Sequence, residues 1–95
     1  TLEEGYAAAR SCGVALLSAM HNTIGDLNRV KSIVKVFGLI NSAPGFFKQP
    51  AVLNGFSDLM AEVFGDAGRH ARSAMGTSSL PFNIPVEVEM LVELK

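Results

Sequence analysis

The sequence predicts an α+β domain in which two helices cover one face of a sheet. A long stripe of apolar residues at helical spacing comes first, a shorter one follows near the middle, and period-two runs of apolar residues lie between and after them. The resulting order of helix, strand, helix, strand and strand is typical of a two-layer sandwich. The 95 residues make a single domain, residues 1–95, since a second would be too small to hold its own core.

The first helix begins with the pattern of a capping box. Thr1 is suited to accept a hydrogen bond from the amide three residues on, and Glu4 is placed to reach back. Apolar residues then recur at helical spacing as far as Met20. We therefore expect one long helix that ends between His21 and Gly25.

Residues 29–40 have the period of a strand and a high β-branched content. In strict alternation, Val34 and Val36 would face the helices. The opposite face begins polar but becomes apolar from Phe37 onward. A strand that is apolar on both faces usually has something covering each, so we expect a neighbouring subunit over the second face.

A loop with Pro44 and Gly45 precedes the second helix, which we expect from Pro50 to Gly65. Asn54 lies off its apolar stripe. Residues 70–76 are predicted as a short strand, and the final strand alternates from Val86 onward. The residues expected between helices and sheet are Val34, Val36, Phe56, Met60, Val88 and Met90.

Composition excludes several classes of protein. The chain is 48% hydrophobic and 18% charged, which indicates a globular protein. That apolar content favours burial against partner subunits over a well-filled monomer.

A net charge of −1 with scattered basic residues disfavours nucleic-acid binding. No apolar run approaches the length of a membrane span. The lone Cys12 forms no internal disulfide, which suggests a reducing, cytoplasmic location.

Arg72 and Glu87 are the strongest candidates for chemistry. If His70, Arg72 and Ala74 share a strand face, Arg72 can point away from the helices and converge with Glu87 on a surface that a partner subunit covers. The planar fork of an arginine suits a carboxylate, and a glutamate beside it can activate water. The alternative, which spacing alone favours, is a cross-strand ion pair of small energetic value.

The other polar residues give no motif. Neither His21 nor His70 has zinc-type spacing with Cys12, and neither has a catalytic Ser or Cys in a recognisable motif. No glycine pattern of a phosphate-binding loop occurs. The residues therefore indicate neither a metal site nor a phosphate-binding loop, and Asn54 taken alone is an ordinary exposed helix residue.

Several segments, taken in order, resemble the Rid (reactive intermediate deaminase, YjgF-like) family and its longer, endoribonuclease L-PSP-like relatives. The segments that carry the resemblance are Gly25–Val30, Gln49–Gly55, His70–Ala74, Leu80–Pro81 and Pro85–Glu89. The resemblance implies a chorismate-mutase-like fold, with two helices on a mixed sheet, and a homotrimer with three clefts between subunits. It also implies that the family's N-terminal hairpin is missing, so that the chain is the C-terminal two-thirds of the fold.

The same resemblance implies a function and a site. Family members hydrolyse 2-enamino or 2-imino acids, released by pyridoxal-phosphate enzymes, to 2-oxo acids and ammonia without a metal or cofactor. By this resemblance Arg72 binds the substrate carboxylate, and Glu87 is the catalytic residue associated with the attacking water. Asn54 lies near the cleft, and we expect it to bind substrate as well. One departure is Ala74, where many deaminases have cysteine.

Two further functions stay open. One is a non-catalytic trimer that binds a small carboxylate metabolite in the same cleft. The other is ribonuclease activity, suggested by the subgroup's name. The acidic charge balance and the lack of a paired His and Lys argue against cleavage of RNA.

Overall fold

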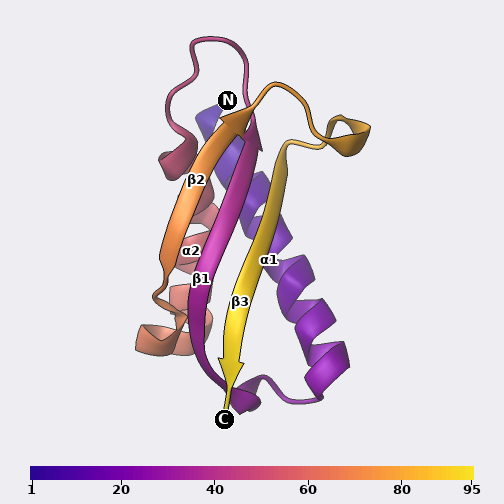
Figure 1. Cartoon of the computed structure of the whole chain (residues 1–95), viewed down its shortest axis with the longest axis vertical. Helices are drawn as coiled ribbons and strands as arrows, with labels where there is room; N and C mark the ends of the chain where they lie inside the picture. The colour runs from indigo at the N-terminus through magenta and orange to yellow at the C-terminus, as the bar shows by residue number, and fades with distance from the viewer.

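The computed structural model describes residues 1–95 and has two layers (Figure 1). Helices α1 (Leu2–Ile24) and α2 (Gln49–Phe64) lie behind a sheet of β1 (Val30–Asn41), β2 (Ala71–Thr77) and β3 (Val86–Leu94). The central strand β1 is parallel to β2 and antiparallel to β3. The predicted fold class, a mixed sheet with both helices on one face, is therefore confirmed.

Helix α1 begins and ends where its sequence indicates. The amide of Glu4 donates to Oγ1 of Thr1 at 3.2 Å, and the reciprocal contact completes the capping box. At the other end Gly25 has φ 86°, a conformation that glycine adopts without strain. Neither this helix nor any other combines the length and the apolar character that a bilayer crossing requires.

The two helices approach each other at backbone distance. A Cβ at Gly55 would overlap the carbonyl oxygen of Tyr6, so only glycine fits this crossing. At the rim, the hydroxyl of Tyr6 donates to Asp58 at 2.7 Å and Arg10 pairs with Glu62 at 2.8 Å. These exposed contacts add little free energy. The glycine contact and the apolar core therefore fix the spacing of the helix pair.

The core lies between the helix pair and the sheet. Val36, Phe56 and Met60 are fully buried, as predicted, while Val88 and Met90 are half-buried and pack against them. The remaining buried members of this cluster are Ala9, Val30, Ile33, Ile40, Val52, Leu53, Leu59 and Val86. Both helices and the two strands β1 and β3 thus contribute to one core.

Strand β1 departs from strict alternation in its first half. Its register with β3 shifts between Val30 and Ser32 and again between Ile33 and Lys35. Each shift places an extra residue in β1, as a β-bulge does. Ile33 consequently faces the helices, whereas Val34 is 42% exposed. The prediction that Val34 belongs to the core was wrong because period-two counting assumes an unbroken ladder.

The face of the sheet turned away from the helices is uncovered and partly apolar. Phe37 and Leu39 of β1 are half-buried there, and their partners across the sheet include Ser73 and Met75 of β2. Met75 is 55% exposed and Leu91 is 63% exposed. The expected apolar character of β1 on both faces is confirmed at this end.

Candidate functional site

Arg72 lies on β2 at the edge of the sheet and its side chain crosses to α2. One terminal nitrogen, Nη2, donates to Oδ1 of Asn54 at 2.7 Å and to the carbonyl oxygen of Pro50 at 3.2 Å. The other, Nη1, donates to Oγ of Ser57 at 3.0 Å. The prediction that Arg72 points away from the helices was therefore wrong. Its contact with Asn54 joins two of the three residues implied by the resemblance.

These contacts limit what the guanidinium of Arg72 offers a ligand. Arginine has five N–H donors in a fixed plane, and three of them are engaged with α2. Both hydrogens of Nη2 are among the three. Because each two-pronged edge of the fork includes one Nη2 hydrogen, a carboxylate needs to displace Asn54 or Pro50 to gain two parallel hydrogen bonds.

A serine and a histidine continue the network from Arg72. Oγ of Ser57 lies 2.9 Å from Nε2 of His70, and Nδ1 of His70 lies 2.6 Å from the carbonyl oxygen of Gly68. A carbonyl only accepts, so Nδ1 carries the hydrogen and Nε2 of the neutral ring is the acceptor. Ser57 therefore donates to His70 and accepts from Arg72.

The network opens onto a shallow pocket of about 190 Å³ between α2 and β2. Its lining is almost entirely polar and consists of Ser57, Asp58, Ala61, Arg69, His70 and Arg72. Asp58 also accepts the hydroxyl of Tyr6, and that hydrogen bond raises the pKa of the tyrosine. Two guanidinium groups, an imidazole and a hydroxyl beside one carboxylate suit a small anion.

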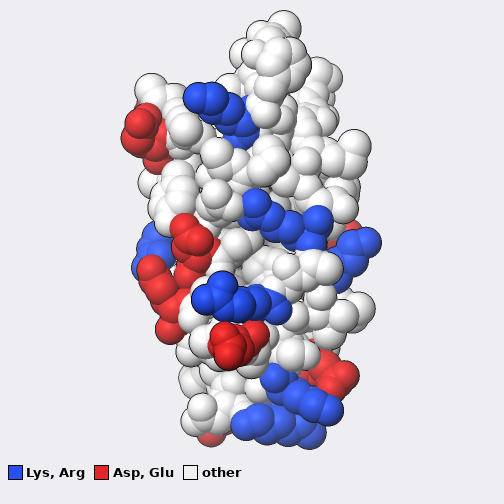
Figure 2. Space-filling model, turned by 90° about the vertical axis from the view of Figure 1, so that its left-hand side faces the viewer, with Lys and Arg blue, Asp and Glu red and all other residues white.

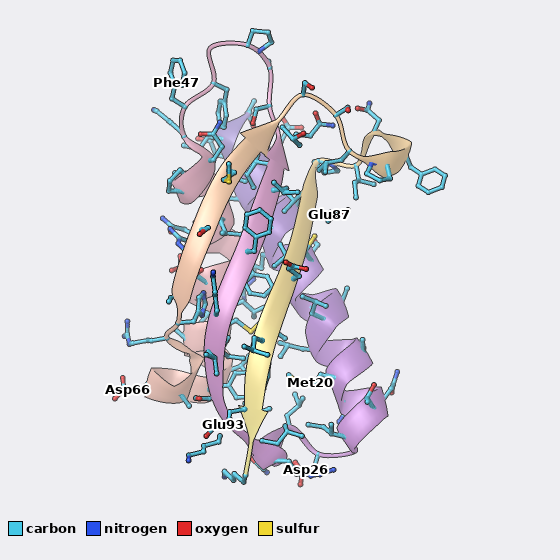
Figure 3. The ribbon with its side chains drawn as sticks, viewed as in Figure 1. Met20, Asp26, Phe47, Asp66, Glu87 and Glu93 are labelled. Carbon is cyan, nitrogen blue, oxygen red and sulfur yellow. The ribbon has the colours of Figure 1, made fainter.

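Glu87 lies on the other side of the sheet. It is on β3 opposite Leu39, on the uncovered face that is turned toward the viewer in Figure 3. A hollow of about 90 Å³ there is lined by Phe37, Leu39, Glu87 and Glu89. Arg72 faces α2, so one subunit does not bring the two residues into one cleft. The alternative of a cross-strand ion pair between them is also excluded.

The remaining candidates have structural surroundings. His21 is exposed in the last turn of α1. Sγ of Cys12 lies 3.6 Å from the carbonyl oxygen of Val86, and burial raises the pKa of this thiol. No group of three or more potential metal ligands gathers anywhere in residues 1–95.

Ser57 and the acceptor role of His70 were not predicted from the sequence. Two spacings in the sequence could have indicated these residues. Ser57 follows Asn54 by three residues, which places both on one face of a helix. His70 precedes Arg72 by two, which places both on one side of an extended segment. Nothing in the sequence, however, shows that these two faces oppose each other.

Comparison with known families decides the relationship. The model of the family described as "YjgF/chorismate mutase-like, putative endoribonuclease" matches residues 1–94. The chain belongs to this family. Within the YjgF/chorismate mutase-like family, a curated relative is protein TCP17 of Trypanosoma cruzi, which is 52% identical over 95 residues.

Two crystal structures resemble the YjgF-like chain closely. The protein Atu1372 of Agrobacterium tumefaciens, described as of unknown function, is 40% identical with a TM-score of 0.97 over the whole chain. A putative endoribonuclease of Shewanella oneidensis is 35% identical with a TM-score of 0.95 over 99% of the chain. The chain spans 59% of TCP17 and 62% of each of these two structures.

Proposed function

We propose that this chain hydrolyses 2-imino or 2-enamino acids to 2-oxo acids and ammonia. The observation that carries the proposal is the guanidinium of Arg72, held by α2 beside a hydroxyl and an imidazole at an open pocket. A fixed guanidinium is suited to orient a small carboxylate, and the groups beside it can exchange protons.

The substrate carboxylate binds Arg72 by displacing one of the contacts that the guanidinium makes with α2. The carboxylate replaces the amide oxygen of Asn54 on Nη2, where the present distance is 2.7 Å. A charged acceptor makes a stronger hydrogen bond with a guanidinium than a neutral amide does. Asn54 therefore lies at the cleft as a competitor of the ligand and keeps Arg72 oriented when no ligand is bound.

Glu87 reaches the substrate from a second copy of the chain. Because Glu87 and Arg72 lie on opposite faces of the sheet, a cleft that contains both needs two subunits, and we propose a homotrimer with three such clefts. The uncovered sheet face around Glu87 supports this assembly, since exposed apolar patches of this kind mark interaction sites. There Glu87 takes a proton from the water that attacks the imine carbon.

The main alternative from the family description is cleavage of RNA. The basic side chains on the face that contains β2 are spaced apart, with acidic ones between them, and form no continuous stripe (Figure 2). A polyanion favours a continuous basic surface. This distribution supports a small anionic substrate over RNA.

The decisive experiment measures ammonia release from a 2-imino acid generated in the assay by an amino-acid oxidase. The wild type should accelerate release above the uncatalysed rate, and Arg72→Ala should not. Saturable binding of 2-oxobutyrate without acceleration would replace the enzyme with a carboxylate-binding protein. RNA cleavage that disappears in Arg72→Ala would favour the ribonuclease instead.

A further inference from the structure

We propose that Ser57 and His70 form a proton relay that serves the site of Arg72. This inference rests on the proposed imine hydrolysis and adds to it two catalytic positions that the resemblance does not supply. Both side chains line the same pocket as Arg72, and the chain of contacts from Arg72 through Ser57 to His70 is continuous.

The geometry sets the direction of transfer. The hydrogen bond from Nδ1 of His70 to the carbonyl of Gly68, at 2.6 Å, leaves Nε2 free to accept a proton. The rings of His70 and Phe56 pack edge to face, with centroids 6.3 Å apart, and this contact helps to hold the imidazole in its orientation. A hydroxyl has one hydrogen and two lone pairs. Ser57 gives its hydrogen to His70, accepts from Arg72, and keeps one lone pair for a proton from the ligand.

No other group beside Arg72 is equally placed for this task. Glu87 of the same subunit lies across the sheet, and the carboxylate of Asp58 is engaged by Tyr6 at 2.7 Å. Arg69, the other charged group of the pocket, is paired with Asp66 and does not release a proton near neutral pH. Imidazole is the side chain that ordinarily exchanges protons in this range.

The chemistry needs such an acceptor because the oxygen of the 2-oxo product keeps neither proton of the attacking water. In the first step water adds to the carbon of the protonated imine, and Glu87 of a second subunit takes one proton. In the second step the carbon–nitrogen bond breaks, Glu87 returns its proton to the departing nitrogen, and the carbonyl forms. The hydroxyl proton passes to Oγ of Ser57 while the serine's own hydrogen moves to Nε2 of His70. The imidazolium then loses this proton to ammonia or solvent.

The test compares His70→Gln with the wild type. Glutamine can accept the hydrogen bond of Ser57 but cannot take up its proton, so kcat for ammonia release should fall about a hundredfold, within the usual range for acid–base catalysis. The affinity for 2-oxobutyrate should change less than about twofold, because Arg72 keeps its contacts. His21→Gln, which changes the exposed histidine of α1, is the matched control and should retain wild-type turnover.

A pair of serine variants separates a relay from a structural role. Ser57→Ala should lose turnover, whereas Ser57→Thr, which keeps a hydroxyl, should recover it at least in part. Absence of ammonia release by the wild type overturns the deaminase and the relay together. Wild-type release with unaltered turnover in folded His70→Gln overturns the relay alone.

Discussion

Nη2 of Arg72 lies 2.7 Å from Oδ1 of Asn54, so the guanidinium already donates to an oxygen of its own chain. Under the proposed function, a carboxylate ligand and Asn54 would compete for the same hydrogen. Asn54→Asp should strengthen the internal contact by adding a charge and weaken 2-oxobutyrate binding about tenfold, equal to about 1.4 kcal/mol. Asn54→Ala should bind at least as tightly as the wild type. Calorimetric titration of the three proteins measures both effects, and a large loss in Asn54→Ala would show that Asn54 contacts the ligand instead.

Arg72→Lys keeps the positive charge but loses the planar fork. Lysine cannot hold Ser57 and also donate two parallel hydrogen bonds to a carboxylate from one plane of donors. We expect 2-oxobutyrate binding to weaken at least about tenfold, near the lower end for a charge-assisted hydrogen bond. Arg10→Lys, at an exposed arginine that pairs with Glu62 outside this pocket, is the matched control and should bind as the wild type does. Equal affinity of Arg72→Lys and wild type would remove Arg72 from the proposed site.

Glu87→Gln should leave carboxylate binding intact and reduce turnover, because an amide cannot take a proton from water. The opposite-face placement of Glu87 and Arg72 adds a sharper test. If each site combines the two residues from different subunits, unfolding and refolding a mixture of Arg72→Lys and Glu87→Gln should restore part of the lost ammonia release. Some clefts of the mixed trimers would then contain both native residues. No recovery from mixtures that demonstrably exchange subunits would contradict a shared site.

The uncovered sheet face should be the contact between subunits. Light scattering should give a mass of three chains for the wild type. Leu91→Glu places a charge on a side chain that is 63% exposed in a single subunit, and desolvation of that charge at an interface is costly. The variant should therefore dissociate while it keeps its far-ultraviolet circular dichroism. A charge at Val14, exposed on α1, is the control and should leave the mass unchanged.

Met60→Ala tests the core. Met60 is fully buried between helices and sheet, and emptying such a position costs about 2–5 kcal/mol of unfolding free energy. Val34→Ala, at the exposed extra residue of the second register shift in β1, should cost less than about 0.5 kcal/mol, as surface changes do. Urea denaturation of both variants measures the difference. Similar losses of unfolding free energy at the two positions would mean that Val34 faces the helices and not the solvent.

The predictable part of this molecule is the part that depends on local pattern. The capping box at Thr1 and the alternation of β3 from Val86 follow from spacing alone, and both are confirmed. The predicted orientation of Val34 toward the core was wrong, because a β-bulge depends on the partner strand as much as on the strand that contains it.

The sequence allowed individual site residues to be predicted, but not their arrangement in space. The family resemblance identified Arg72 and Asn54, which the structure brings together, and Glu87, which it places on the other side of the sheet. The bond between Ser57 and His70 depends on how far α2 sits along β2. That offset is set by packing between distant segments, such as Leu53 against Gly38, and no pattern within either segment reports it.

The two bulges of β1 also separate two halves of the strand whose amides should differ in protection against hydrogen exchange. From Lys35 to Ile40 the strand is flanked by β2 on one side and by β3 on the other, whereas from Val30 to Val34 it pairs with β3 alone. Protection against hydrogen exchange follows such differences in local opening. The slowest-exchanging amides should therefore cluster between Lys35 and Ile40, and the bulged half should open first. Arg72 pairs with Val36, so the pocket lies where the firmly held stretch begins, next to the half that opens first.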